Sequence, residues 1–247
     1  MASCAKEALG TGTGSAGFRL SMYTKEQFAK TIDNTLLRPN STLADVQELC
    51  DESAARHFAA VCILPCWVGA AARCLHGTDV KVCTVAAFPF GANTRLSKVY
   101  EARNAVANGA QEVDIVMNIS RFKSGDLEYV LDDLRGVADA VRGSALLKVI
   151  IETCYLTGDE IETASRLVQE SGADFVKTST GTAGGGATTD DIRRIRRAIG
   201  ASTIGIKASG GIKTVELAQQ LLDAGANRLG TSSGAALYDA YLPEDSA

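Results

Sequence analysis

The stretch SGADFVKTSTG, residues 171–181, joins the end of a helical pattern to a short apolar run and a glycine-containing turn. Gly172 stands just past the helical pattern, where the left-handed conformation costs a glycine little. The same joint recurs as Asn108-Gly109-Ala110 and Ala224-Gly225-Ala226, each directly before another β-rich run. In each joint a small alanine lets the incoming strand pack under the helix. The recurrence predicts a chain built from repeated β–α units.

From about residue 24 onward, short β-branched runs alternate with longer stretches of helical spacing. The predicted strands are residues 31–37, 59–65, 81–88, 112–119, 146–153, 175–180, 203–210 and 227–233. The predicted helices lie near residues 42–55, 66–75, 94–108, 127–141, 157–171, 188–198 and 214–224, with one more after 234. Eight β–α units in about 220 residues without a linker favour an α/β fold, a single-domain (β/α)8 TIM barrel over residues 24–247. A doubly wound open sheet is the alternative, but it usually has fewer strands and a glycine-rich turn after the first one, which this chain lacks.

Composition argues against several classes of partner. The 247-residue chain has a net charge of −4, so no overall positive field draws it to nucleic acid or to a membrane surface. Residues 1–23 are predicted to be a flexible extension rich in Gly, Ser and Thr. They contain no apolar run long enough for a secretory signal or a membrane span. Gly12, Gly14 and Gly17 formally match a dinucleotide fingerprint, but no strand precedes them and no helical pattern follows directly.

The seven cysteines are dispersed and form no paired C-x-x-C motifs. A zinc site would have to join Cys62 and Cys66 to His57 and His76, the two histidines of the chain. We therefore expect reduced, mostly buried thiols and no metal. Reduced thiols are typical of a reducing compartment, which predicts a cytoplasmic location.

The polar residues near the carboxyl ends of the predicted strands are the first candidates for function. In (β/α)8 barrels the chemistry takes place at these strand ends. The residues concerned are Asp33, Asp114, Glu152, Lys177, Lys207, Ser232 and Ser233.

Three lysines lie inside β-rich runs: Lys148 in LLKVIIET, Lys177 in FVKTSTG and Lys207 in IGIKASGG. Lysine is almost never fully buried unless it is paired. Alternate residues of a barrel strand point toward the axis or toward the helices, and the helices offer an ammonium no favourable place. We expect the three amines to point inward, near one another. Burial and a second ammonium both favour the neutral amine, which can attack a carbonyl and form a Schiff base.

An acid in the middle of an apolar strand accompanies these lysines. Asp114 lies within EVDIVMNI, where it can act as a general acid or base, directly or through a water molecule. The alternative for each lysine is a structural ion pair with Asp114 or Glu152. The two interpretations are compatible, because a lysine–carboxylate cluster can also pass protons.

Two glycine- and serine-rich turns predict an anion site. KASGG, residues 207–211, ends the seventh predicted strand, and GTSSG, residues 230–234, ends the eighth. Backbone N–H groups, hydroxyls and a following helix N-terminus together bind phosphate, and these loops are its usual position in this fold. A third stretch, residues 178–186, lacks the Gly-Lys-Ser/Thr of a Walker motif. It either approaches the substrate closely or is a plain flexible loop.

Several stretches together resemble the deoxyribose-phosphate aldolase family. VKTSTG, residues 176–181, and KASGG, residues 207–211, are highly specific at this separation. The further matching stretches are residues 32–39, 82–92, 109–119, 146–157, 172–188, 206–214 and 228–234, so that the resemblance spans residues 32 to about 237.

The resemblance implies a class I aldolase that reversibly cleaves 2-deoxy-D-ribose 5-phosphate to D-glyceraldehyde 3-phosphate and acetaldehyde. Lys177 then matches the Schiff-base lysine, Lys207 the lysine that tunes it and helps to move protons, and Asp114 a proton donor and acceptor. The matching substrate- and phosphate-binding residues are Thr180, Gly181, Gly210, Gly211, Gly230, Ser232 and Ser233. No metal or organic cofactor is expected, because the protonated imine is itself the electron sink. The implied partners are a small phosphosugar and, at most, a second copy of the chain in a homodimer.

The departures from the family pattern are small. The family usually has histidine at Asn34 and lysine at Arg38, a Gly-Phe-Pro-Leu-Gly pattern where this chain has VAAFPFG, and an aromatic residue near Thr182-Ala183. All three central catalytic positions are nevertheless filled.

Two alternative functions remain at this point. One is another lysine-dependent barrel aldolase that acts on a different sugar phosphate. The other is a non-catalytic barrel that binds a phosphometabolite, although a binding protein has no need of paired buried lysines.

Overall fold

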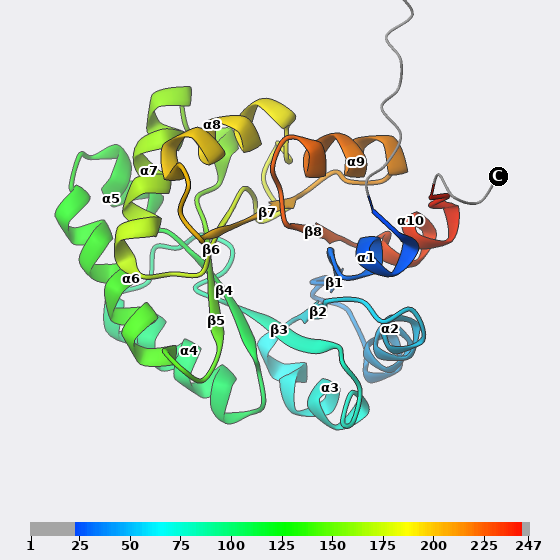
Figure 1. Ribbon diagram of the computed structural model, residues 1–247. Coiled ribbons are helices and arrows are strands. Elements are labelled where there is room, and N and C mark those ends of the chain that lie inside the picture. Colours follow the sequence, from blue (N-terminus) through cyan, green and yellow to red (C-terminus); the bar gives the residue numbers. More distant parts are fainter. Residues whose placement is uncertain (1–22, 244–247) are drawn as a thin grey trace, which may run out of the picture.

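The computed structural model describes residues 23–243, and within them eight parallel strands form a closed barrel in sequence order. Figure 1 shows the helices as an outer ring around these strands. The last strand pairs with the first through Asp33 and Gly230, which closes the barrel. The strands are β1 Ile32–Leu36, β2 Ala60–Ile63, β3 Lys81–Ala86, β4 Glu112–Val116, β5 Leu146–Ile150, β6 Phe175–Lys177, β7 Gly205–Ser209 and β8 Arg228–Thr231. The predicted (β/α)8 barrel is confirmed, and every predicted strand is present.

The predicted helices are also present. They are α2 Leu43–Ala55, α3 Val68–Cys74, α4 Arg95–Ala107, α6 Leu127–Val141, α7 Gly158–Ser171, α8 Thr189–Ile199, α9 Val215–Asp223 and α10 Gly234–Ala240. A 3-10 turn, η1 Pro65–Trp67, precedes α3 inside the range predicted as one helix. Three short elements were not predicted: α1 Lys25–Ala29, α5 Ile119–Lys123 and η2 Thr153–Tyr155. Five residues or fewer do not complete two helical turns, so they leave no periodic pattern to recognise.

The helix ends follow the signals in the sequence. Thr157 begins α7 with a capping box, in which its side chain accepts the N–H of Glu160 and the Glu160 side chain accepts the N–H of Thr157. The glycines of the three repeated joints, Gly109, Gly172 and Gly225, have φ angles of 109°, 82° and 114°. These left-handed conformations favour glycine and turn the chain from each helix into the next strand.

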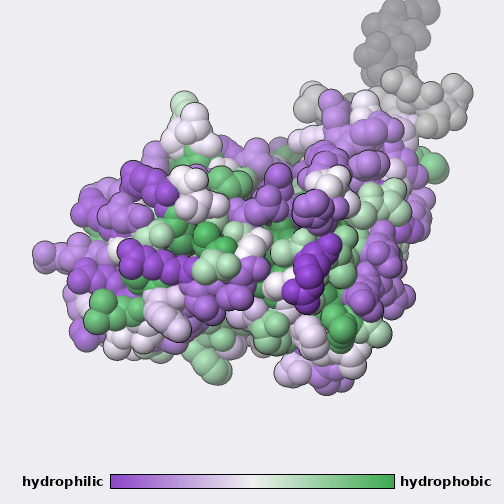
Figure 2. Space-filling model, turned by 90° about the horizontal axis from the view of Figure 1, so that it is seen from below, coloured by the Kyte–Doolittle hydropathy of each residue, from purple (hydrophilic) through white to green (hydrophobic). Residues whose placement is uncertain are grey.

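The main hydrophobic core lies between the barrel and the helices. In α8, for example, Ile192, Ile195 and Ile199 are buried at helical spacing, while charged residues occupy most of the other positions. Figure 2 shows one face of the molecule, on which hydrophilic residues dominate and apolar residues form small groups between them. The inside of the barrel differs, because its separate apolar cluster contains only Ala60, Cys62, Cys83 and Val85 at its centre. The rest of the barrel interior is therefore available for polar and charged side chains.

Some predictions fall partly or wholly outside the described residues. These are the extension of residues 1–23, of which only Tyr23 is described, and the match at Gly12 to Gly17. Among residues 23–243, no helix is long and apolar enough to cross a membrane.

We predict that replacing Gly205 by alanine destabilises the amino-terminal end of the barrel. A Cβ atom at Gly205 would lie 2.2 Å from Cε1 of Phe175, on the adjacent strand. Such overpacking costs about 1–3 kcal/mol, measurable as a lower free energy of unfolding in urea. Adding Phe175→Leu should recover part of the loss. Gly184→Ala is the matched control, because no atom lies within 4 Å of its added Cβ. Equal stability of Gly205→Ala and the control would contradict this packing.

Candidate active site

Lys177 and Lys207 meet at one carboxylate inside the barrel. Their Nζ atoms donate to the same oxygen, Oδ2 of Asp114, each at 2.7 Å. The two nitrogens are therefore no farther apart than twice this distance. Lys177 is only 3% exposed, and the other two side chains are fully enclosed. The three residues predicted for catalysis thus form one cluster, and the predicted inward orientation of the lysines is what the structure shows.

The third strand lysine belongs to the same cluster. Lys148 donates to the other oxygen of Asp114, Oδ1, at 2.9 Å, and its Nζ lies 2.5 Å from Oε2 of Glu112. Asp33 completes the group, with its Oδ2 atom 2.5 Å from Lys207 Nζ. The ion-pair alternative weighed for these lysines is therefore also realised, with Asp114 as the partner.

The electrostatics of this cluster hold the carboxylate of Asp114 ionised. Burial alone raises the pKa of Asp114, but Lys148, Lys177 and Lys207 outweigh it and hold that pKa well below its usual range. Burial lowers the pKa of Lys207, whereas Asp114 and Asp33 raise it above the ordinary value by a larger amount. Lys207 therefore stays protonated beside Lys177. A lysine can lower the proton affinity of a neighbouring amine only while it carries this charge.

A cavity of about 350 Å³ opens above Lys177 at the carboxyl ends of the strands. It is lined by Thr35, Leu36, Leu37, Arg38, Lys177, Thr180, Gly181, Thr182, Ser209, Gly210, Gly211, Ile212, Lys213, Gly230, Thr231 and Ser232. In this lining the basic side chains are Arg38, Lys177 and Lys213, and no acidic side chain accompanies them. Such a cavity suits an anion the size of a small phosphosugar.

Six of the seven residues predicted for substrate and phosphate binding line this cavity. The exception is Ser233, whose backbone N–H donates to Oγ1 of Thr231 at the start of α10. Gly181, Gly210 and Gly211 have φ angles of 83°, 88° and 77°, conformations that few other residues adopt. These three turn positions therefore require glycine for their backbone conformation.

Glu152 contacts a backbone N–H group and not one of the strand lysines, with which an ion pair was considered. It is buried in a left-handed conformation, with φ of 52° and ψ of 70°, at the end of β5. Its carboxylate accepts the backbone N–H of Thr180, with both oxygens at 3.2 Å. This strained backbone conformation directs the Glu152 carboxylate to Thr180, and so it holds the loop that follows Lys177.

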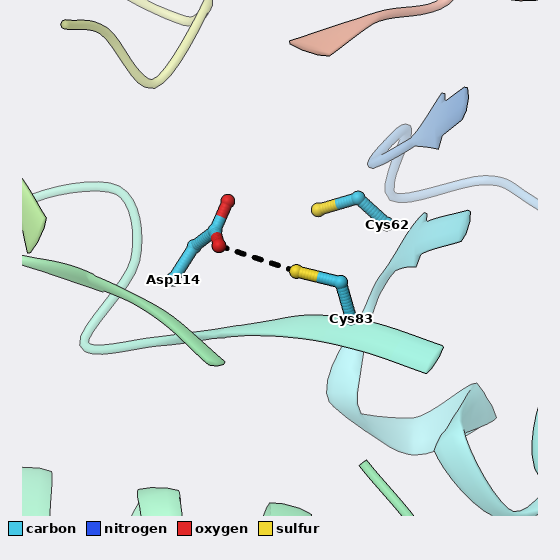
Figure 3. Close-up of side chains that lie close together, drawn as sticks. All are labelled: Cys62, Cys83 and Asp114. Atoms are coloured by element: carbon cyan, nitrogen blue, oxygen red, sulfur yellow. Dashed lines mark hydrogen bonds between the residues drawn. The ribbon is translucent and has the colours of Figure 1, made fainter. Parts of the chain in front are cut away.

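Two cysteines lie beside Asp114, as Figure 3 shows. The Cys83 thiol donates to Asp114 Oδ1 at 3.2 Å, and the ligand atoms of Cys62, Cys83 and Asp114 lie within 4.8 Å of one another. A metal ion would fit these atom types, but Asp114 already accepts hydrogen bonds from three lysine amines and Cys83 accepts from Lys148 at 3.3 Å. Zinc at Cys62 and Cys66 is also disfavoured, because Cys62 is enclosed in the barrel whereas Cys66 is exposed.

Several residues of the site were not predicted from the sequence. Glu112 and Arg228 join the interior ion pairs, although neither was singled out. Glu112 precedes Asp114 by two residues on one strand, so strand alternation could have placed both on the inner face. Lys213 lies in a quoted motif, but a lysine in a loop is common on any protein surface.

We predict that Gly230→Ala displaces Lys207 from Asp114. An added Cβ would lie 3.0 Å from Cε of Lys207 and 2.9 Å from Cβ of Ser209, so the lysine side chain must move. A crystal structure of the variant should show Lys207 Nζ more than about 3.5 Å from Asp114 Oδ2, beyond hydrogen-bonding distance. An unmoved lysine in a folded variant would show that Gly230 serves only the turn.

Comparison with known proteins identifies the family. The sequence profile of the DeoC/LacD family aldolases matches residues 22–240. The deoxyribose-phosphate aldolase of Thermoanaerobacter sp. (strain X514) is 51% identical over 215 residues, which cover 86% of this chain and 96% of the relative.

Solved structures agree with this assignment. A structure from Coccidioides immitis, assigned as a deoxyribose-phosphate aldolase, has a TM-score of 0.86 at 37% identity and covers 92% of this chain and 91% of its own. The tetrameric deoxyribose phosphate aldolase of Aeropyrum pernix has a TM-score of 0.82 at 30% identity, covering 87% and 91%. The chain therefore belongs to the DeoC/LacD family of aldolases, which are carbon–carbon lyases.

Proposed function

We propose that this aldolase is a class I enzyme that reversibly cleaves 2-deoxy-D-ribose 5-phosphate to D-glyceraldehyde 3-phosphate and acetaldehyde. The observation that carries the proposal is the amine of Lys177, which lines a cationic cavity and shares one carboxylate oxygen with Lys207. The names of the relatives support the same substrate.

The reaction begins when neutral Lys177 attacks the C1 aldehyde of the sugar. Its proton passes to Asp114, which is ionised and lies 2.7 Å away. Asp114 returns this proton to the former carbonyl oxygen. A second proton, taken up from solvent, lets that oxygen leave as water, which gives the protonated imine and leaves Asp114 ionised. Lys207 stays charged between Asp114 and Asp33, so it favours the neutral form of Lys177 before attack.

Cleavage follows from the same groups. Removal of the C3 hydroxyl proton, by Asp114 directly or through a water molecule, lets the C2–C3 electron pair flow into the imine. Glyceraldehyde 3-phosphate leaves, and the remaining enamine takes up a proton at C2. Water then attacks the imine, releases acetaldehyde and restores the Lys177 amine. Because the imine accepts the electron pair, the balance of this scheme needs neither metal nor organic cofactor.

The phosphate group is bound at the other end of the cavity. Gly210 and Gly211 after β7, and Gly230 and Ser232 at the end of β8, present backbone N–H groups and a hydroxyl there. Lys213 adds a positive charge from the same lining. Thr180 and Gly181 close the cavity on the β6 side, held by Glu152. Ser233 does not line the cavity, and its backbone N–H donates to Oγ1 of Thr231, so its phosphate contact stays a prediction from the resemblance.

The cellular location and assembly are also proposals. The six cysteines that the structure describes are unpaired, which supports a reducing compartment and hence the cytoplasm. The homodimer that the resemblance allows stays a prediction, and the relative from A. pernix is a tetramer.

Borohydride reduction in the presence of deoxyribose 5-phosphate tests the Schiff base. We expect a stable mass increase on the peptide that carries Lys177, with none in Lys177→Leu, and loss of at least about 10³-fold in kcat in that variant. Lys81→Leu is the control, because Lys81 also lies on a strand but is exposed at the other end of the barrel. Adduct formation at another lysine would overturn the assignment.

The choice of substrate is tested in the same experiment. Cleavage of fructose phosphates at a higher kcat/KM than deoxyribose 5-phosphate would favour a different sugar phosphate. Binding of deoxyribose 5-phosphate without turnover would favour a binding protein.

Removal of metal ions should leave the activity unchanged. The atoms of Asp114 and Cys83 that could bind a metal already accept hydrogen bonds from lysine amines, and the proposed chemistry uses the imine instead. Dialysis against EDTA, followed by the cleavage assay, should give the same kcat as untreated enzyme. Loss of activity that returns on adding Zn²⁺ would show that this interpretation of the cluster is wrong.

A further inference from the structure

A continuous chain of ion pairs runs from Lys177 through the barrel to its amino-terminal end. Lys177 and Lys148 bind the two oxygens of Asp114, and Lys148 in turn contacts Glu112 at 2.5 Å. Glu112 pairs with Arg228, whose Nη2 atom lies 2.9 Å from Oε2. Glu112 and Arg228 are the first residues of β4 and β8, so they lie opposite the cavity.

Asp33 provides a second path along the same axis. Its Oδ1 atom accepts from Nε of Arg228 at 2.7 Å and also from Nη2, while its Oδ2 atom contacts Lys207. Lys207 then leads back to Asp114 and Lys177. Every member of the two paths except Arg228 is almost completely enclosed, and the Arg228 side chain is 12% exposed.

All eight strands contribute a titratable side chain to this interior. In strand order they are Asp33, Cys62, Cys83, Glu112 with Asp114, Lys148, Lys177, Lys207 and Arg228. At the mouth, Glu152 is buried against Thr180, and Arg38 and Lys213 line the cavity together with Lys177. Burial raises the pKa of the Cys83 thiol, so it stays neutral. The pKa of Cys62 is lowered by its hydrogen bond with Cys83 and by the nearby Lys207 and Lys177, against the effect of burial.

The charges of the ion-paired groups balance in one arrangement. Asp33, Asp114 and Glu112 supply three negative charges, and Lys148, Lys207 and Arg228 supply three positive ones. Lys177 is the fourth basic group, so with both thiols protonated the interior is neutral when Lys177 has lost its proton. A net charge in a buried volume is costly, which makes this arrangement the favoured one.

We infer that Glu112 and Arg228 are positioning residues that act on Lys177 from the far end of the barrel, by balancing the interior charge so that Lys177 is the amine left neutral. They touch neither the cavity nor the reacting atoms and act through Lys148 and Asp33. The inference rests on the proposed function, because it concerns the nucleophile of that reaction. It extends the catalytic unit beyond the three residues next to the substrate.

The sign of each effect follows from the balance. Arg228→Gln removes a positive charge and leaves an excess of negative charge, so Lys177 should keep its proton to a higher pH. Glu112→Gln removes a negative charge, so Lys177 should lose its proton at a lower pH. A unit charge about 10 Å away in a partly buried site shifts such an equilibrium by on the order of one pH unit, or about tenfold in the neutral fraction.

The test compares the pH dependence of kcat/KM and of borohydride trapping at Lys177, both with deoxyribose 5-phosphate. The acidic limb of both profiles should move up in Arg228→Gln and down in Glu112→Gln. It should return close to the wild-type position in the double variant, which restores the balance. Arg228→Lys keeps the charge and should leave the limb in place, even if its lost contacts reduce kcat at every pH.

The control outside the barrel is Arg56→Gln, which breaks the surface pair with Asp239 at 2.8 Å and should not move the limb. Coincident limbs in all variants, or shifts of the same sign in both single variants, would overturn the inference. If one single variant fails to fold, the other single variant must still shift and the double variant must not.

Failure of the proposed function gives a different result. In that case wild-type enzyme would form no borohydride-stable adduct at Lys177 at any pH. A wild-type adduct whose pH profile is the same in every variant would leave the proposed function intact and remove only the role of Glu112 and Arg228.

Discussion

The carboxylate of Asp114, enclosed in the barrel and shared by three lysines, is the interaction on which the rest of the site depends. It draws Lys148, Lys177 and Lys207 from three successive strands to one point. An ionised acid alone would be too costly to bury there, and three ammonium groups without it would repel one another. The lysines and the acid therefore stabilise one another inside the barrel. The same cluster supplies the amine and the carboxylate that the proposed reaction uses.

The fold could be predicted because its signals are local. Each signal, whether a β-rich run, a helical period or a glycine joint, spans fewer than about twenty residues. The alternation of these signals is compatible with few folds other than a barrel. The inward position of Lys177 and Lys207 was predictable for a similar reason, since two-residue alternation and the cost of a buried ammonium leave one face of the strand for them.

The partners within the interior could not be predicted in the same way. Arg228 meets Asp33 on the adjacent strand β1 and Glu112 on β4 across the barrel, 195 and 116 residues away in sequence. Such pairs depend on strand tilt and register, which the sequence does not state. Glu152 illustrates a second limit: its left-handed backbone and its bond to Thr180 follow from the turn after β5, whereas its position alone suggested an ion pair.

The central claim is that a balanced set of buried charges leaves Lys177 as the neutral amine. A joint neutron and X-ray structure of the deuterium-exchanged, substrate-free protein at neutral pD would show the hydrogen positions directly. The account predicts two deuterons on Nζ of Lys177 and three on Nζ of both Lys148 and Lys207, with all three carboxylates of the interior unprotonated. Three deuterons on Lys177, or only two on Lys207, would contradict it.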